Sequence, residues 1–177
     1  MNRPADELER MMRRFDAVIR DAGVKRTPQR REIFLQAAAT TDHPDIEAVL
    51  RGVRRTMPHV SLDTVYRALA VFAELGLIST VRPQGRNHVR FDANTARHHH
   101  FVCSRCGAVL DFADRDFDNL RVPASAATLG KVVSRHVELR GLCAFCAAGA
   151  PGATRASARR PIGTKSHRTY NKTARRD

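Results

Sequence analysis

Apolar side chains recur at steps of three and four through the first 76 residues, which is the spacing of one buried face of an α-helix. The pattern predicts four helices, over about residues 5–22, 28–39, 46–56 and 62–75. Thr27 and Ser61 stand where helix N-caps are expected, and Gly23 and Gly76 stand where helices stop. The predicted inward positions are Leu8, Met11, Met12, Phe15, Val18 and Ile19 of the first helix, Ile33, Phe34 and Ala37 of the second, Ile46, Val49, Leu50 and Val53 of the third, and Leu62, Val65, Leu69, Phe72 and Leu75 of the fourth.

The pattern changes after the fourth helix. "LISTVRP" and "HVRFD" predict two short strands joined by Gln84, Gly85 and Arg86. Helices followed by such a hairpin indicate a winged helix-turn-helix domain over residues 1–88. Strands are also predicted in "FVC", "VLDF" and "KVVSRHVEL", with a helix near residues 116–129, so residues 89–146 are expected to form a small α/β domain. The predicted fold class is therefore α+β.

The net charge of the chain indicates which class of molecule it is expected to bind. The 177-residue chain has 31 Lys and Arg against 18 Asp and Glu, a net charge of +13 that attracts polyanions such as DNA, RNA or an anionic membrane. The N-terminus lacks the apolar segment of a signal peptide, and no apolar run is long enough to span a bilayer, so we expect a cytoplasmic protein without a membrane partner. Residues 147–177 hold eight Lys or Arg and few large apolar side chains, which predicts a disordered basic tail that either aids solubility or contacts phosphates.

The fourth predicted helix carries side chains that suit base recognition. Thr64, Tyr66 and Arg67 lie in its N-terminal half, off the apolar stripe. In helix-turn-helix proteins this half enters the major groove, where Arg pairs with guanine and a ring packs on thymine methyl groups. Phosphate contacts are expected from the basic residues Lys25, Arg26, Arg30, Arg54 and Arg55. The alternative is an ordinary solvated amphipathic helix.

The four cysteines form two Cys-x-x-Cys pairs, Cys103 with Cys106 and Cys143 with Cys146. Each such turn presents two thiolates on one side, and two turns complete a tetrahedral sulfur site that suits zinc. Because four protein ligands leave no open position, the predicted zinc is structural. The alternatives are a disulfide pair or a redox-active pair.

Nitrogen and oxygen ligands gather beside the first pair. On a strand, His98 and His100 point to one face and His99 to the other. Asp92 precedes them, and Asp111 is brought back beside them by the hairpin after the first cysteine pair. A sulfur-free set of this kind favours iron(II) or manganese(II) without excluding zinc or nickel. The alternative is a solvated histidine-rich surface.

The order of these motifs resembles the ferric uptake regulator family of metal-dependent repressors, over about residues 8–146. The resemblance is carried by "GVKRTPQR", "HPDIEAVL", "SLDTVYRALAVFAELGLI", "VRFD", "HHHFVCSRCGAVLDF" and "GLCAFC". It implies a homodimer that binds palindromic operator DNA through the N-terminal domain and dimerises through the C-terminal domain. It also implies structural zinc on the four cysteines and a regulatory metal on His43, Asp92, His98, His100 and Asp111. His43 would come from the DNA-binding half and the other four ligands from the second half, so that the metal clamps the two together.

Within that family, Asp92 resembles the peroxide-responsive members, whereas iron-uptake regulators usually carry Glu there. In the peroxide-responsive members, bound iron(II) reacts with peroxide and oxidises a ligand histidine, His43 or His98 by position. An iron-responsive uptake regulator, or a nickel or zinc sensor, is the alternative. The zinc-sensing members usually have a cysteine before the histidine motif, and this chain has none between Ala5 and Val102. A further metal site using His99 or His136 stays open, because His136 stands one residue nearer the second cysteine pair than in many relatives.

Two other classes of protein fit less well. Zinc deaminases place Pro before a Cys-x-x-Cys and Glu near the ligand histidine, and neither occurs here. We therefore expect no enzyme activity and no small organic substrate. RNA-binding proteins that stack bases use clustered aromatic side chains, and this chain has only two Tyr, eight Phe and no Trp.

Overall fold

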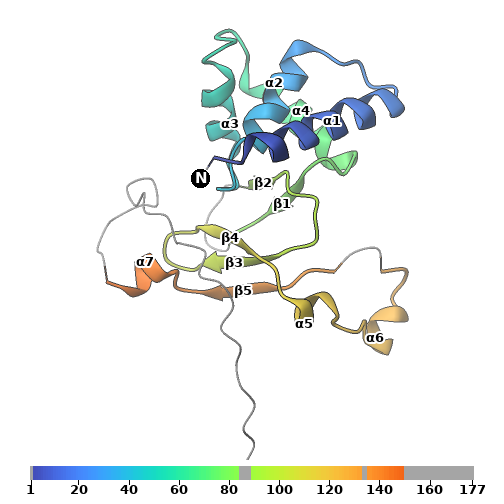
Figure 1. The fold of residues 1–177 in the computed structure, drawn as a ribbon, viewed down its shortest axis with the longest axis vertical. Helices are drawn as coiled ribbons and strands as arrows, with labels where there is room; N and C mark the ends of the chain where they lie inside the picture. The colour runs from blue at the N-terminus through green and yellow to red at the C-terminus, as the bar shows by residue number, and fades with distance from the viewer. Residues whose placement is uncertain (1, 84–88, 133–134, 150–177) are drawn as a thin grey trace, which may run out of the picture.

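The computed structural model describes residues 2–83, 89–132 and 135–149. Its N-terminal part is a unit of four helices, drawn at the top of Figure 1. They are α1 (Ala5–Asp21), α2 (Pro28–Ala38), α3 (Ile46–Val53) and α4 (Leu62–Glu74). No helix in the described ranges is long and apolar enough to cross a membrane.

The core of this unit is built on three aromatic rings. Phe15 stacks on Phe34 with ring centroids 4.7 Å apart, and Phe72 meets both rings edge-on at 5.4 and 5.8 Å. All three side chains are buried, as the periodic pattern predicted. One predicted core position is wrong: Leu62 is 48% exposed, because it occupies the first turn of α4, beyond the edge of the core.

Local signals set the helix boundaries. The Thr27 hydroxyl accepts a hydrogen bond from the Arg30 backbone N–H, and the Ser61 hydroxyl accepts one from Thr64 N–H, which confirms both predicted N-caps. Gly76 follows α4 with φ of +64°, a left-handed conformation that glycine adopts without strain. The third helix ends at Val53, three residues before its predicted end, and continues as a turn.

A two-stranded hairpin follows the helices. The predicted hairpin is confirmed: strands β1 (Ser79–Val81) and β2 (Arg90–Asp92) pair antiparallel, and Ser79 lies opposite Asp92. The predicted turn residues Gln84, Gly85 and Arg86 lie outside the described residues. Phe91 and Ala93, on either side of Asp92, belong to the core of the helical unit.

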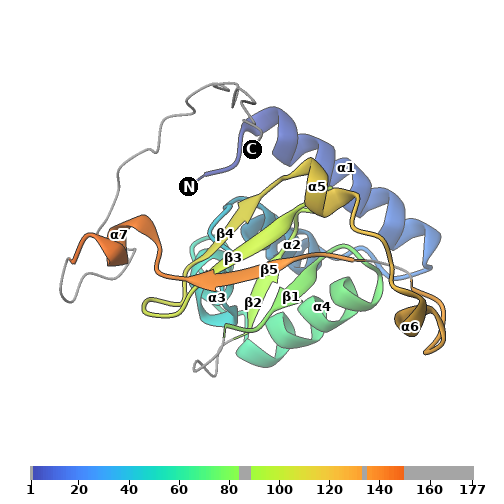
Figure 2. The ribbon, with the colours of Figure 1, turned by 90° about the horizontal axis from the view of Figure 1, so that it is seen from below.

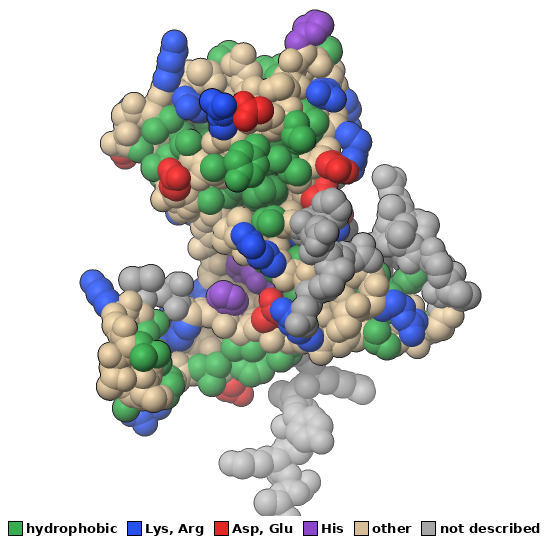
Figure 3. Space-filling model, turned by 180° about the vertical axis from the view of Figure 1, so that it is seen from behind, with side chains coloured by type: hydrophobic (Ala, Val, Ile, Leu, Met, Phe, Trp, Pro, Cys, Tyr) green, Lys and Arg blue, Asp and Glu red, His purple; other side chains and the backbone are tan. Residues whose placement is uncertain are grey.

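The second unit is a three-stranded sheet in the order β4-β3-β5, which lies below the helices in Figure 1 and faces the viewer in Figure 2. It consists of β3 (His99–Cys103), β4 (Val109–Phe112) and β5 (Glu138–Gly141). Strand β3 pairs antiparallel with β4, placing His100 opposite Asp111, and parallel with β5, placing Cys103 opposite Gly141. Figure 3 shows the two units as an upper and a lower lobe, with histidine side chains at the waist between them. The predicted α+β class is confirmed.

Two predictions in this unit are wrong in detail. The single helix expected near residues 116–129 is two short helices, α5 (Arg115–Asp118) and α6 (Ala124–Ala127). Pro123 separates them, since proline has no N–H for a helix interior and here adopts an extended conformation at the N-cap of α6. The strand expected from Lys131 begins only at Glu138, and residues 133–134 lie outside the described ranges. The last helix is α7 (Ala144–Ala147), and the predicted basic tail falls almost wholly on residues outside the described ranges.

Candidate metal centres

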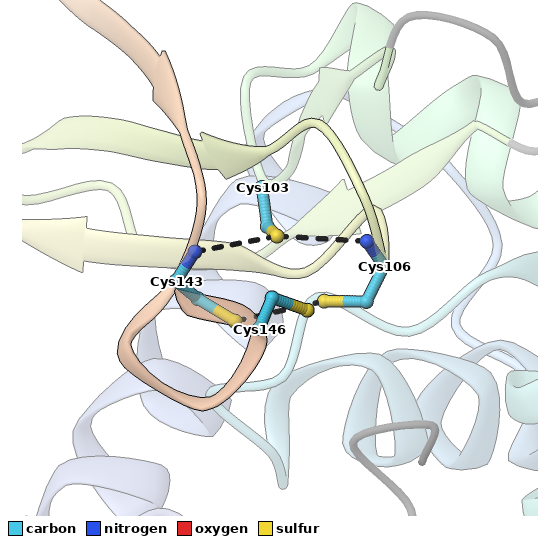
Figure 4. Close-up of side chains that lie close together, drawn as sticks. All are labelled: Cys103, Cys106, Cys143 and Cys146. Carbon is cyan, nitrogen blue, oxygen red and sulfur yellow. Dashed lines mark hydrogen bonds between the residues drawn. The ribbon is translucent and has the colours of Figure 1, made fainter. Parts of the chain in front are cut away.

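The four cysteines meet at one end of the sheet (Figure 4). Cys103 ends β3, Cys106 lies in the turn that follows, Cys143 is the N-cap of α7, and Cys146 lies within α7. Their sulfur atoms all lie within 4.8 Å of one another, with 3.8 Å between those of Cys106 and Cys143, and no disulfide joins them. The structure therefore brings together all four predicted zinc ligands.

Strand pairing brings the second cysteine pair to the first. Gly141 lies opposite Cys103 in the parallel β3–β5 ladder, two residues before Cys143. A Cβ atom at Gly141 would lie 3.2 Å from the Phe101 ring, so glycine permits this close approach. Arg105 then ties the two turns together, because its guanidinium donates a 2.7 Å hydrogen bond to the Cys146 carbonyl.

Backbone N–H groups favour the thiolate of Cys103. Burial opposes ionisation, but N–H donors from Cys106, Cys143 and Arg105 outweigh it and lower the Cys103 pKa to about 6. The Cys143 and Cys106 donors lie 3.3 and 3.5 Å from the Cys103 sulfur. A buried thiolate group surrounded by three other thiols fits a closed tetrahedral zinc site.

The second cluster lies between the two units. His43, in the loop after α2, meets Asp92 of β2, His98, and His100 of β3, with one ligand atom of each within 4.8 Å of the others. The Nε2 atoms of His98 and His100 are 2.9 Å apart, and His98 Nε2 is 2.9 Å from Asp92 Oδ2. The cluster is buried: His43, Asp92 and His100 are 2%, 3% and 6% exposed.

The fifth predicted ligand, Asp111, closes the cluster from β4. Its Oδ1 lies 2.9 Å from His43 Nε2 and 3.6 Å from His100 Nε2. The described residues thus bring together the whole predicted set, with three nitrogen and two carboxylate ligands. Iron(II) and manganese(II) suit such a set.

The surroundings of the His43 ring are the strongest evidence that the histidine and aspartate cluster binds a cation. Both of its nitrogens are buried and neither makes a hydrogen bond, since Asp111 approaches Nε2 closely but without hydrogen-bond geometry. Buried polar atoms without partners are rare because they lose their hydration with no compensation. A cation held by His43 Nε2 and the neighbouring carboxylates would remove that cost from the ligating nitrogen.

A hydrogen bond at Nδ1 of the His98 ring orients this histidine as a metal ligand. Nδ1 of His98 lies 2.7 Å from the Ala96 carbonyl and carries a hydrogen, so Nε2 is the nitrogen that faces the cluster and can bind an ion once its own proton has left. Asn94 acts similarly on the carboxylates: its backbone N–H donates to Asp92 Oδ1 at 2.7 Å, and its amide Nδ2 to Asp111 Oδ2 at 3.4 Å. Sequence reasoning missed Asn94, although its position two residues after an aspartate is the spacing of an Asx turn.

The division of ligands between the units differs from the prediction. Asp92 was expected to belong with the C-terminal ligands, but the side chains flanking it pack into the helical core. Phe91 N–H also donates to the Pro44 carbonyl at 2.9 Å, next to His43. By packing, His43 and Asp92 therefore come from the helical unit, and the other three ligands come from the second unit.

A proton competes with metal at His98. The hydrogen bond to Asp92 raises the His98 pKa to about 9, against the opposing effect of burial. Metal binding must displace this proton, so we expect Mn²⁺ affinity to rise with pH, by up to about tenfold per unit until the pKa is passed. Isothermal titration with Mn²⁺ at several pH values between about 7 and 9 checks this. An affinity that stays constant over the range would contradict it.

Two other histidines lie near the cluster without joining it. His99 is buried, its Nδ1 accepts a hydrogen bond from Val137 N–H, and its Nε2 lies 3.4 Å from Asp118 Oδ1. The His136 ring lies 6.1 Å from that of His100. Among the described residues, only the two clusters above gather three or more potential ligands closely enough for one ion.

The predicted DNA contacts all lie on the surface of the helical unit. Lys25, Thr64, Tyr66 and Arg67 are exposed, and Tyr66 is 63% exposed. The Arg67 guanidinium pairs with Asp63 one turn earlier, at 2.9 Å.

Comparison with known proteins identifies the family of this chain. The sequence model of the ferric uptake regulator family matches residues 21–140. The chain belongs to this family. Family members are metal-responsive transcriptional repressors, and the predicted resemblance is confirmed.

Similar members include peroxide-responsive repressors named PerR. That of Staphylococcus saprophyticus is 30% identical over 146 residues, covering 82% of this chain and 98% of the relative. That of Staphylococcus epidermidis is 29% identical, covering 82% and 97%. Among solved structures, the Pseudomonas aeruginosa ferric uptake regulator with manganese has a TM-score of 0.58 and 27% identity, covering 73% of this chain and 97% of that one. The Helicobacter pylori ferric uptake regulator has the same fold, with a TM-score of 0.62 at 23% identity, covering 79% and 93%.

Proposed function

We propose that this member of the ferric uptake regulator family is a metal-dependent repressor that binds palindromic operator DNA as a homodimer and senses peroxide through bound iron(II). Residues 1–88 would bind DNA, and residues 89–146 would dimerise and bind metal. The observation that carries the proposal is the position of His43. Its buried ring makes no hydrogen bond and reaches from the helical unit to ligands of the second unit, with Nε2 2.9 Å from Asp111 Oδ1.

The two clusters would have different roles. The four cysteines would hold structural zinc, which staples α7 and the β3–β4 turn to the sheet. The regulatory ion, iron(II) or manganese(II), would be held by His43, Asp92, His98, His100 and Asp111. Of these, His43 and Asp92 are fixed to the helices, so ion binding joins the helical unit to the sheet. In a dimer this would fix the separation of two recognition helices, and metal would select the DNA-competent arrangement.

Recognition would use the exposed N-terminal half of α4. Thr64, Tyr66 and Arg67 are placed to meet base edges, and Lys25 to meet a phosphate. We expect Arg67→Ala to weaken operator binding by roughly 1–3 kcal/mol and to relax preference at one base pair. Fluorescence anisotropy with single-substitution operators measures both effects. Arg13→Ala is the matched control, because Arg13 also pairs with an acidic residue one helical turn away on an exposed face.

Peroxide is expected to act only through iron. Iron(II) held by these five residues would supply the electrons that activate hydrogen peroxide. One oxygen atom of the peroxide would be added to the imidazole of His43 or His98, and the other would leave as water. We expect the iron-loaded protein to lose operator affinity after peroxide and to gain the mass of one oxygen on one of these residues. The manganese-loaded protein should keep its affinity. Gel-shift assays and peptide mass spectrometry check this. Iron-dependent binding that survives peroxide, with no added oxygen, would instead support an iron-responsive uptake regulator, the second candidate.

A further inference from the structure

The loop that carries His43 is held on one side by the hairpin. The Arg90 guanidinium lies 3.4 Å from the His43 carbonyl and 3.5 Å from Asp45 Oδ2. Arg90 and Asp45 also form an isolated β-bridge. His43 itself has φ of +48°, a left-handed conformation that a non-glycine residue keeps only when its surroundings impose it.

The other side of the loop is held by the first residues of the chain. Asn2 forms an isolated β-bridge with Thr40, three residues before His43. Arg3 donates from its backbone N–H to the Ala39 carbonyl at 2.9 Å and from Nε to the Ala38 carbonyl at 2.8 Å. Its guanidinium also pairs with Glu7.

Burial of the Arg3 side chain is unusual. It is only 4% exposed, and an arginine is rarely buried unless its donors are matched. The partners of Arg3 are carbonyls at the C-terminal end of α2, which have no partner within the helix. A positive charge is also favourable at that end of a helix. Arg3 thus fixes the point at which the chain leaves α2, four residues before His43.

We propose that Arg3 is a positioning residue for His43: by holding the end of α2 it directs the following loop, so that the imidazole reaches the regulatory ion. The inference rests on the proposed function, because it requires His43 to be a ligand. Loss of the Arg3 contacts would free one side of the loop, and His43 would reach the ion in a smaller fraction of molecules. Removal of a group that hydrogen-bonds directly to a metal ligand typically changes metal affinity by about 10- to 100-fold, and Arg3 acts through the intervening loop, so we expect an effect at the lower end of that range.

The test is a Mn²⁺ titration of the zinc-loaded full chain, with free Mn²⁺ followed by electron paramagnetic resonance. We expect Arg3→Ala to weaken Mn²⁺ binding about 10-fold with unchanged zinc content. Arg3→Lys should recover part of the affinity, since an ammonium can still donate to the carbonyls. Arg10→Ala is the matched control: Arg10 lies in α1 and pairs with Asp6 on the surface, and the variant should bind Mn²⁺ as the parent does.

Repeating the Arg3 substitution in the His43→Ala variant separates a positioning role of Arg3 from general destabilisation of the fold. In His43→Ala, the substitution Arg3→Ala should cause no further loss of Mn²⁺ affinity, because the residue that it positions is gone. An equal loss in both backgrounds, or no loss in either, would overturn the inference. If Arg3→Ala does not fold, Arg3→Met replaces it with the same expectations, because methionine keeps the length of the side chain but has no donor for the carbonyls. If the His43→Ala variant binds Mn²⁺ with unchanged affinity, the assignment of His43 as a ligand is overturned. If His43→Ala lowers the Mn²⁺ affinity and Arg3→Ala does not, only the role of Arg3 is overturned.

Discussion

His43→Ala is expected to abolish the manganese-dependent increase in operator affinity, a loss of about 10- to 100-fold, while zinc stays bound at the four cysteines. His43 is one of two ligands that belong to the helical unit by packing, and both nitrogens of its buried ring lack a hydrogen bond. Without it, the ion retains ligands from the second unit but loses a principal connection to the helices. Operator binding measured by fluorescence anisotropy, with and without Mn²⁺, gives the effect directly.

The matched control is His136→Ala. This histidine lies beside His100 but offers no ligand atom to the cluster, so its removal should leave the manganese response intact. An equal loss in the two variants would indicate that the loss in His43→Ala comes from disturbed packing near His100. A normal manganese response in His43→Ala would remove the proposed link between metal and DNA.

Cys103→Ser is expected to remove zinc and to unfold the second unit. Cys103 is 1% exposed, joins β3 to the first turn of the site, and accepts N–H groups from both cysteine turns. Few apolar side chains of this unit are buried among the described residues: Val102 and Val109 pack with Val81 of β1, and Ala108 packs with Cys103 and Cys146 at the cysteine site itself. Binding of structural zinc contributes on the order of 10 kcal/mol in small zinc domains, so this unit should not stay folded without it.

Zinc content per chain and circular dichroism during heating measure that prediction. Ser104→Ala is the control, since Ser104 is an exposed neighbour that supplies no sulfur. One zinc per chain and an unchanged melting temperature in Cys103→Ser would mean that the cysteine cluster is not a structural zinc site.

The sequence predicted elements well where local physics determines them. The helices around Phe15, Phe34 and Phe72 follow the periodic pattern, and the hydroxyls of Thr27 and Ser61 set where two of them begin. Prediction failed where apolar spacing was weak. Between residues 116 and 129 the pattern favoured one helix, but Pro123 divides it, and strand β5 owes its position to pairing with β3, which is a long-range contact.

The metal-binding residues likewise fall into those that local sequence patterns predicted and those that depend on tertiary contacts. The cysteine spacing and the alternation of His98 and His100 are local patterns. The clusters contain these residues, and Asp111 contacts the second cluster through His43 and His100. His43 lies in a loop far from the other ligands along the chain, and only resemblance to a known family singled it out. The assignment of Asp92 to the helical unit, and the contacts of Arg3 and Asn94, depend on tertiary packing that no local pattern encodes.

Anomalous diffraction at the manganese edge, from crystals of the manganese-loaded protein bound to operator DNA, tests the central claim most directly. We predict one manganese ion per chain within bonding distance of His43 Nε2 and of the Nε2 atoms of His98 and His100. Manganese bound to the histidines of the second unit, with operator engaged and the His43 ring turned away from the ion, would contradict the account.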